Sequence, residues 1–276
     1  MSTVRANGAE LYYETRGAAG DPVVLVHGSL VDHHTWDAVV GPLAEALQVI
    51  AYDRRGYGRS TGPRRVRSVR DDTEDLAGLL QATELYPAHI VTHSYAGAMA
   101  FRLAQDRPEM VRSIAVHEPP MVGLLEGDPG SASEARQWLG AIAHLRGIIE
   151  AGERESAART IVESFSVQPG AWERLPPEVR ALTLRHVGLW ADEFADREAV
   201  EPDREGLRDL LIPVLLTTGE QSPPFLRRIV QQLAGLLRNA TQSTFLGAGH
   251  APQVTAPSGY LGVVGTFLLE RNVPTV

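Results

Sequence analysis

The stretch that decides the fold lies at residues 89–100 and reads HIVTHSYAGAMA. Its first residues, up to Thr92, favour a β-strand, and the small residues from Ala96 onward favour a helix. Ser94 therefore falls on a short turn between a buried strand and a tightly packed helix. A serine in this place is either the N-cap of the helix or a nucleophile that the turn presents to a substrate.

Short apolar runs alternate with amphipathic segments on both sides of this turn. The runs predict buried strands at 22–28, 48–53, 88–92, 111–118, 212–219 and 241–247. The segments between them predict helices at 35–47, 69–83, 95–108, 223–237 and 258–270. Such alternation is typical of a parallel sheet with right-handed crossovers. Near the start, Asn7-Gly8 between alternating apolar and polar residues predicts a type I′ hairpin and an antiparallel edge pair.

The alternation stops in the middle of the chain. Between about 121 and 210 the pattern is helical, with helices predicted at 134–152, 156–165 and 177–194. We therefore expect an α/β core made of residues 1–120 and 211–276, interrupted by a helical cap at 121–210.

Composition excludes several kinds of chemistry and partner. Cysteine is absent and every one of the 26 Lys+Arg residues is arginine, which excludes thiol nucleophiles, thiolate metal sites and lysine Schiff bases. The net charge of −8 argues against a nucleic acid or an anionic membrane as partner, and the basic run at 63–70 is predicted to be a solvated loop. With no secretory signal at the start and no apolar stretch of membrane length, we expect a cytoplasmic protein.

Five segments occur in an order that is specific when taken together. They are VHGSLVDHHTW (26–36), YDRRGYGRS (52–60), THSYAG (92–97), VHEPP (116–120) and GAGHAPQ (247–253). With the strand pattern around them, these segments resemble the α/β-hydrolase superfamily over nearly the whole chain. The resemblance implies a mostly parallel sheet with an inserted helical lid.

The same resemblance implies a nucleophile and a base. Ser94 lies at the position of the nucleophile, and His250, after the last strand, lies at the position of the general base. The residues two before and two after the serine, where glycine is commonest, are Thr92 and Ala96. Ala96 is small enough for the turn, whereas the β-branched Thr92 is expected to strain it.

The acid of the predicted triad has two candidates. In many relatives it follows the strand at 212–219, but the expected position holds Ser222, and Glu220 follows the strand too closely to reach His250 well. Glu118 lies at the end of the strand predicted at 111–118, a position that resembles the acid of some haloalkane dehalogenases and of zearalenone lactonases. We favour Glu118 and keep Glu220 as the alternative.

Two backbone N–H groups, those of Ser29 and Tyr95, are implied as the oxyanion hole. Three side chains are expected to contact the substrate: Leu30, His33 and Trp190. A metal held by His33 and His34 is the alternative for this loop, but no carboxylate or cysteine has matching spacing. We therefore expect neither a metal nor a cofactor.

A serine at 94 decides between reaction types, because it can form an acyl-enzyme. We expect hydrolysis of a small hydrophobic ester or lactone, by an enzyme that resembles the lactonase and esterase branch. The alternatives are a C–C bond hydrolase or a perhydrolase with the same triad, and a non-catalytic ligand-binding protein of this fold. A homodimer stays open as the assembly.

Overall fold

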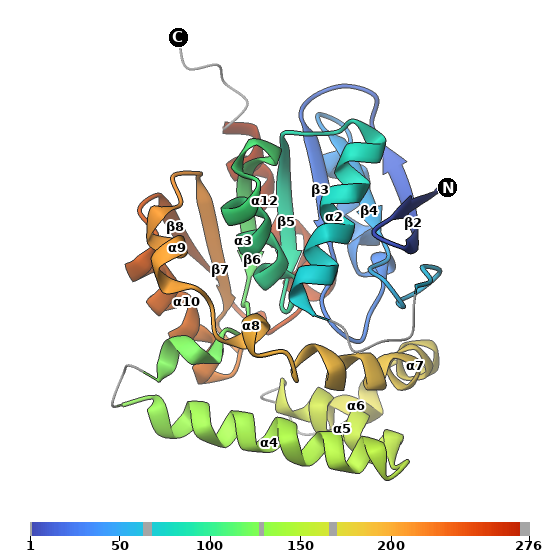
Figure 1. The fold of residues 1–276 in the computed structure, drawn as a ribbon, viewed down its shortest axis with the longest axis vertical. Coiled ribbons are helices and arrows are strands. Elements are labelled where there is room, and N and C mark those ends of the chain that lie inside the picture. The colour runs from blue at the N-terminus through green and yellow to red at the C-terminus, as the bar shows by residue number, and fades with distance from the viewer. Residues whose placement is uncertain (1, 63–67, 127–129, 166–169, 271–276) are drawn as a thin grey trace.

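One mostly parallel sheet of eight strands, in the order β1-β2-β4-β3-β5-β6-β7-β8, runs through the molecule (Figure 1). This computed structural model describes residues 2–62, 68–126, 130–165 and 170–270. The strands are β1 (Ser2–Ala6), β2 (Ala9–Arg16), β3 (Pro22–Val26), β4 (Gln48–Tyr52), β5 (Ala88–His93), β6 (Val111–His117), β7 (Val214–Gly219) and β8 (Ala240–Phe245). Strands β3 to β8 pair in parallel, whereas β1 and β2 pair antiparallel.

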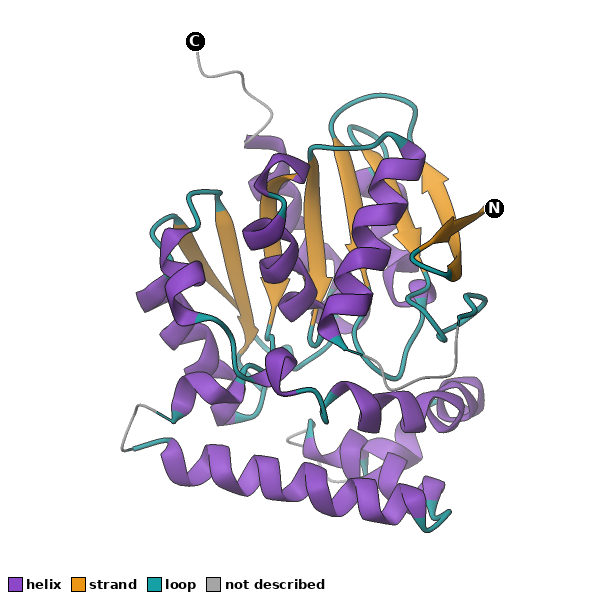
Figure 2. Ribbon diagram, in the orientation of Figure 1, coloured by secondary structure: helices purple, strands orange, loops and turns teal. Residues whose placement is uncertain are grey.

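Helices cover both faces of the sheet, as Figure 2 shows. One face carries α2 (Val69–Thr83), α3 (Ala96–Asp106) and α10 (Pro224–Leu236), and the other carries α1 (Asp37–Leu43) and α12 (Pro257–Glu270). Alternate residues of β3 therefore enter two different hydrophobic cores: Val24 and Val26 enter the first, and Val23 and Leu25 the second. Burial on both faces explains the continuous apolar runs in the sequence.

A helical insertion, residues 122–209, lies between β6 and β7 and covers the carboxyl ends of the parallel strands (Figure 1). Its elements are η3 (Val122–Leu125), α4 (Ala132–Glu150), α5 (Arg154–Ser164), α6 (Ala171–Arg174), α7 (Pro177–Glu193), α8 (Arg197–Val200) and α9 (Arg204–Asp209). Its place in the chain agrees with the helical segment expected from the sequence. The division into two domains with boundaries at 120 and 211 stays a prediction.

The local predictions fail mainly where elements are short. Asn7 and Gly8 both have positive φ, 43° and 75°, as a type I′ hairpin requires, so that prediction is confirmed. The helix predicted at 35–47 is instead a 3₁₀ turn, η1 (His33–Trp36), followed by α1, which ends at Leu43. Pro42 lies inside α1 and lacks the N–H that would otherwise donate to the Ala38 carbonyl, which weakens this turn of the helix. Helices of four to six residues, such as α6, α8, α9 and α11 (Pro252–Thr255), are too short to show a helical period.

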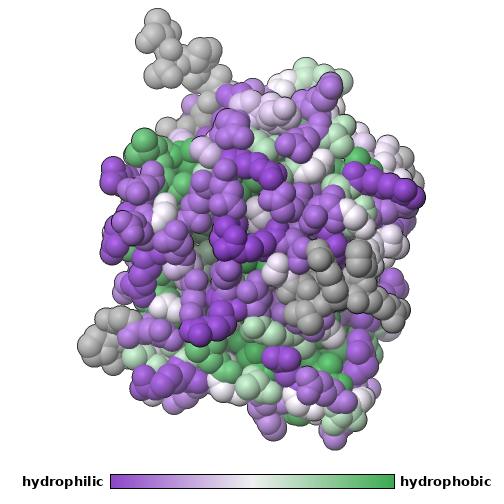
Figure 3. Space-filling view, viewed as in Figure 1, coloured by the Kyte–Doolittle hydropathy of each residue, from purple (hydrophilic) through white to green (hydrophobic). Residues whose placement is uncertain are grey.

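The surface shown in Figure 3 is largely hydrophilic, and hydrophobic residues gather at the level of the helical insertion. Among the described helices, none combines the length and apolar character that crossing a bilayer requires. Most of the basic run predicted to be a solvated loop, residues 63–67, lies outside the described residues.

Gly97 sets how closely α3 approaches β6. A Cβ added at Gly97 would lie 2.7 Å from Val116 Cγ2 and 2.7 Å from Pro119 Cβ. Both neighbours are buried, so neither has free space to move into. The small side chain that the strand-to-helix turn demands is therefore needed at Gly97 as well as at Ala96.

We predict that Gly97→Ala lowers the free energy of unfolding by about 1–3 kcal/mol, because the added methyl group overpacks the contact between α3 and β6. The matched control is Gly140→Ala in α4, where an added Cβ meets nothing within 4 Å. This control should raise stability, by up to about 1 kcal/mol, because alanine is the better helix former. Urea unfolding of both variants measures the effect, and equal changes would contradict the prediction.

Candidate active site

Ser94 lies on a sharp turn between β5 and α3. Its φ of 55° is left-handed, a conformation that costs free energy for any residue other than glycine and that clusters at functional sites. The Ser94 N–H donates to the carbonyl oxygen of His117 at the end of β6 (2.8 Å). Thr92, expected to strain the turn, is fully buried, and its hydroxyl has no hydrogen-bond partner among the described residues.

Glu118 is a second residue with left-handed backbone, at a φ of 46°, one position after β6. Its side chain is fully buried, and its Oε2 lies 2.7 Å from Nδ1 of His250. Its other oxygen, Oε1, accepts hydrogen bonds from the Thr218 hydroxyl (2.6 Å) and the Gly219 N–H (2.7 Å). Both carboxylate oxygens are therefore fixed, and one of them faces the histidine.

The Glu118 carboxylate is charged in this setting. Burial acts to raise the pKa of Glu118, but the neighbouring His117 and His250 outweigh it and hold that pKa below its usual range. A carboxylate beside Nδ1 keeps the proton of a neutral His250 on that nitrogen. Nε2 is then left unprotonated, as a general base requires.

Glu220, the alternative acid, is engaged elsewhere. It is exposed, and its Oε2 accepts a hydrogen bond from the Gly247 N–H (2.8 Å). Ser222, at the position where many relatives carry the acid, is buried. The structure thus pairs His250 with Glu118, the residue that the sequence favours. Glu220 instead forms a hydrogen bond with the loop that contains Gly247.

Two further imidazoles pack around His250. His93 Nε2 lies 2.6 Å from the His250 carbonyl oxygen, and the two rings are 4.7 Å apart. Burial holds the pKa of His93 well below its usual value, so the ring is neutral and donates Nε2–H to that carbonyl. His117 Nε2 lies 3.4 Å from Glu118 Oε2, and burial also lowers the pKa of His117. Sequence reasoning missed His117, although it directly precedes the favoured acid.

Ser94 and His250 both lie on the wall of a cavity of about 450 Å³ beneath the helical insertion. Phe165 of the wall stacks on the His250 ring at 4.8 Å. The other apolar residues of the wall are Leu30, Val31, Ile161, Val162, Leu175, Val179, Trp190, Phe194 and Ala251. Leu30 and Trp190 thus lie where the sequence predicts substrate contacts.

His33, the third predicted contact residue, is not among the described residues of this wall. Its Nδ1 lies 2.7 Å from Asp53 Oδ1, and the His33 N–H donates to the same oxygen (2.9 Å). The chain turns at Leu30, whose φ is 71°, and His33 then starts η1. The hydrogen bonds to Asp53 therefore direct His33 into the core and away from this cavity, so a contact of His33 with substrate there is not proposed further.

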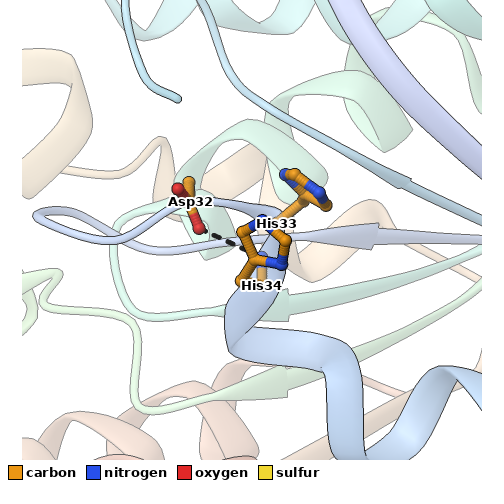
Figure 4. Close-up of side chains that lie close together, drawn as sticks. All are labelled: Asp32, His33 and His34. Carbon is orange, nitrogen blue, oxygen red and sulfur yellow. Dashed lines mark hydrogen bonds between the residues drawn. The ribbon is translucent and has the colours of Figure 1, made fainter. Parts of the chain in front are cut away.

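Asp32, His33 and His34 lie close enough for one atom of each to contact a common cation (Figure 4). Asp32 Oδ1, however, accepts the His34 N–H (3.1 Å), and Nδ1 of His33 is bonded to Asp53. The second group of this kind is His117, Glu118 and His250, whose atoms form the acid–base pair described above. Members of both groups thus already form hydrogen bonds within the protein. The absence of a metal stays a prediction.

The loop between β3 and η1, residues 27–32, is called the Ser29 loop; it lies directly against the turn that carries Ser94. A Cβ added at Gly28 would lie 2.7 Å from His93 Nδ1 and 3.1 Å from Ser94 Cβ, so only glycine fits there. Tyr95 is the N-cap residue of α3, where backbone N–H groups have no acceptor within the helix. The two residues predicted to supply the oxyanion donors thus lie beside Ser94: Tyr95 follows it in the chain, and Ser29 lies on the same cavity wall.

Comparison with known proteins agrees with this architecture. Residues 21–257 match the family described as the alpha/beta hydrolase fold. A 2-hydroxymuconate semialdehyde hydrolase of Pseudomonas sp. (strain CF600) is 28% identical over 270 residues, which cover 94% of this chain and 90% of the relative. A 2-hydroxy-6-oxo-2,4-heptadienoate hydrolase of Pseudomonas putida is 26% identical over 98% of this chain and 96% of that relative.

Among solved structures, a thermophilic esterase from Thermogutta terrifontis superposes with a TM-score of 0.76. It is 22% identical, and the match covers 99% of this chain and 100% of the esterase, a likeness of fold. The mostly parallel sheet of eight strands and the helical insertion between β6 and β7 agree with these matches. The chain therefore belongs to the α/β-hydrolase family.

Proposed function

We propose that the protein is a serine hydrolase that cleaves a small, uncharged, hydrophobic ester or lactone through an acyl-enzyme. The observation that supports this most is the hydrogen bond of 2.7 Å between the buried Glu118 and His250, at the cavity wall that also holds Ser94. A positioned carboxylate, imidazole and hydroxyl are the groups that acyl transfer to serine requires.

In the first half of the proposed reaction, His250 Nε2 takes the proton of Ser94 as Oγ attacks the carbonyl carbon. The oxygen of the tetrahedral intermediate takes up negative charge, and the N–H groups of Ser29 and Tyr95 stabilise it. His250 then gives its proton to the leaving alcohol, and the acyl group stays on Ser94. Glu118 stabilises the positive charge that His250 carries between these two steps.

In the second half, a water molecule attacks the acyl-enzyme. His250 removes a proton from the water, the same two N–H groups stabilise the second oxyanion, and the carboxylic acid leaves as Ser94 regains its proton. For a lactone, the alcohol and the acid are two ends of one product. No cofactor takes part in the proposed sequence.

The cavity wall supports an uncharged substrate. Its described residues are mainly apolar and include no arginine, and the chain has no lysine. Burying a carboxylate without a cationic partner costs several kcal/mol. The two hydrolases of Pseudomonas are named for carboxylates, a muconate and a heptadienoate. C–C bond hydrolysis is the second candidate because these relatives match nearly the whole chain. The apolar cavity wall, however, favours a substrate that carries no carboxylate.

We predict that Ser94→Ala and His250→Ala each lower kcat by at least about 10³-fold with the fold intact, as in other serine hydrolases. Glu118→Gln should lower kcat by about 10²–10⁴-fold, because a neutral amide cannot stabilise the charged His250. Hydrolysis of p-nitrophenyl esters measures these losses, and thermal melting checks the fold.

Glu220→Gln is the matched control, since it replaces the other candidate carboxylate, which accepts a hydrogen bond from the Gly247 N–H, by an amide. We expect it to change kcat by less than about 3-fold, because an exposed loop contact contributes little to transition-state stabilisation. Equal losses in Glu118→Gln and Glu220→Gln, or the reverse order, would overturn the assignment of the acid.

We also predict a strong preference for neutral acyl groups. The ester p-nitrophenyl hexanoate and the half-ester mono-p-nitrophenyl adipate have six-carbon acyl chains, but the second ends in a carboxylate. The value of kcat/KM should be at least about 10²-fold higher for the hexanoate, because the cavity wall offers the carboxylate no cationic partner. Comparable values for the two esters would argue against an uncharged substrate.

A further inference from the structure

A buried carboxylate of the helical insertion reaches the predicted oxyanion hole. Glu193, at the end of α7, is fully buried. Its Oε2 accepts a hydrogen bond from the Ser29 hydroxyl (2.5 Å). Its Oε1 accepts one from the Tyr57 hydroxyl (2.9 Å) and lies 2.7 Å from Nη1 of Arg54. One side chain of the insertion thus contacts three residues of the core.

Arg54, in turn, fixes the backbone that leads into Ser29. Its side chain is 1% exposed. Nε donates to the carbonyl oxygen of His27 (2.9 Å), and Nη2 donates to that of Gly28 (3.0 Å). The Gly28 carbonyl and the Ser29 N–H belong to the same planar trans peptide group and point in opposite directions. Arg54 therefore sets the direction of the Ser29 N–H through the other side of that peptide.

The same guanidinium contacts the second predicted oxyanion donor. Arg54 Cζ lies 4.9 Å from the centroid of the Tyr95 ring. The Tyr95 hydroxyl donates to Asp72 Oδ2 (3.1 Å), and Nη1 of Arg54 lies 3.4 Å from that oxygen. The arginine thus holds the side chain of one donor residue and the peptide of the other.

Among the described ion pairs of Arg54, the contact of Nη1 with Glu193, at 2.7 Å, is shorter than that with Asp72, at 3.4 Å. A buried guanidinium needs such a partner to keep its position, because a buried charge without one is strongly destabilising. Glu193 also accepts a hydrogen bond from the Ser29 side chain. It therefore acts on the Ser29 loop both directly and through Arg54.

We propose that Glu193 is a positioning residue for the oxyanion hole. Through Arg54 and Ser29 it holds the two N–H donors at the point where the substrate oxygen becomes charged. Because Glu193 comes from the helical insertion, the hole is complete only when α7 is seated on the core. This inference rests on the proposed function of Ser94 as the nucleophile.

Sequence reasoning did not identify Glu193. It lies three residues after Trp190, so both fall on a buried face of α7 that also carries Val187 and Ala191. An acidic residue on an apolar helix face is the signal that would have marked it.

A fluorophosphonate probe tests the proposal without knowledge of the natural substrate. Ser94 Oγ forms a bond to phosphorus, fluoride leaves, and the proton of Ser94 passes to His250. The phosphoryl oxygen occupies the oxyanion hole during this step, so the maximal labelling rate depends on the two N–H donors. The probe concentration that gives half of this rate reports binding instead.

Glu193→Gln should lower the maximal labelling rate at Ser94 by about 10-fold or more, up to the loss of about 10²–10³-fold that follows removal of an oxyanion donor. The half-saturating probe concentration should change by less than about 2-fold, a split that a loss of folded protein would not produce. Glu193→Asp keeps the buried charge but shortens the side chain. It should also slow labelling, and it serves if Glu193→Gln does not fold.

Glu134→Gln is the matched control, because it breaks another ion pair between the insertion and the core, that of Glu134 in α4 with Arg228 in α10. Its labelling rate should equal that of the wild-type protein. A wild-type protein that is not labelled at Ser94 would overturn the proposed function and the inference with it. Normal wild-type labelling with an unchanged rate in both Glu193 variants, or an equal loss in Glu134→Gln, would overturn the inference alone.

Discussion

The geometry of the site depends on two residues held in a left-handed backbone conformation, Ser94 and Glu118. They follow the neighbouring parallel strands β5 and β6, whose register pairs His93 with His117. The hydrogen bond from the Ser94 N–H to the His117 carbonyl joins the two turns. Because parallel strands end at one edge of the sheet, this pairing brings the proposed nucleophile and the proposed acid together there. His250 comes from the loop after β8, and its Nδ1 meets Glu118 at this edge.

Placing the acid after β6 changes what the end of β7 does. In many relatives, as the resemblance implies, the acid follows β7. Here Thr218 and Gly219 at that point donate hydrogen bonds to Glu118. The end of β7 thus becomes the support of the acid on the neighbouring strand. A buried carboxylate with both oxygens hydrogen-bonded has little freedom to rotate, which preorganises His250 for proton transfer.

The sequence was informative where structure depends on near neighbours in the chain. The buried strands, the turn at Ser94 and the placement of Glu118 directly after a strand all follow from local patterns of residue type. The position of His33 and the role of Glu193 could not be predicted in this way. Each depends on contacts between residues distant in sequence, His33 with Asp53 and Glu193 with Ser29, which only the folded chain reveals.

The central claim is that Ser94 carries the acyl group of the substrate between two half-reactions. Partition of that group between water and added methanol tests the claim most directly, with esters of hexanoic acid that differ in their leaving alcohol. A common acyl-Ser94 intermediate predicts the same ratio of methyl hexanoate to hexanoic acid for every ester, whatever its rate of cleavage. A ratio that changes with the leaving group would show that no common acyl-enzyme forms, and would contradict the account.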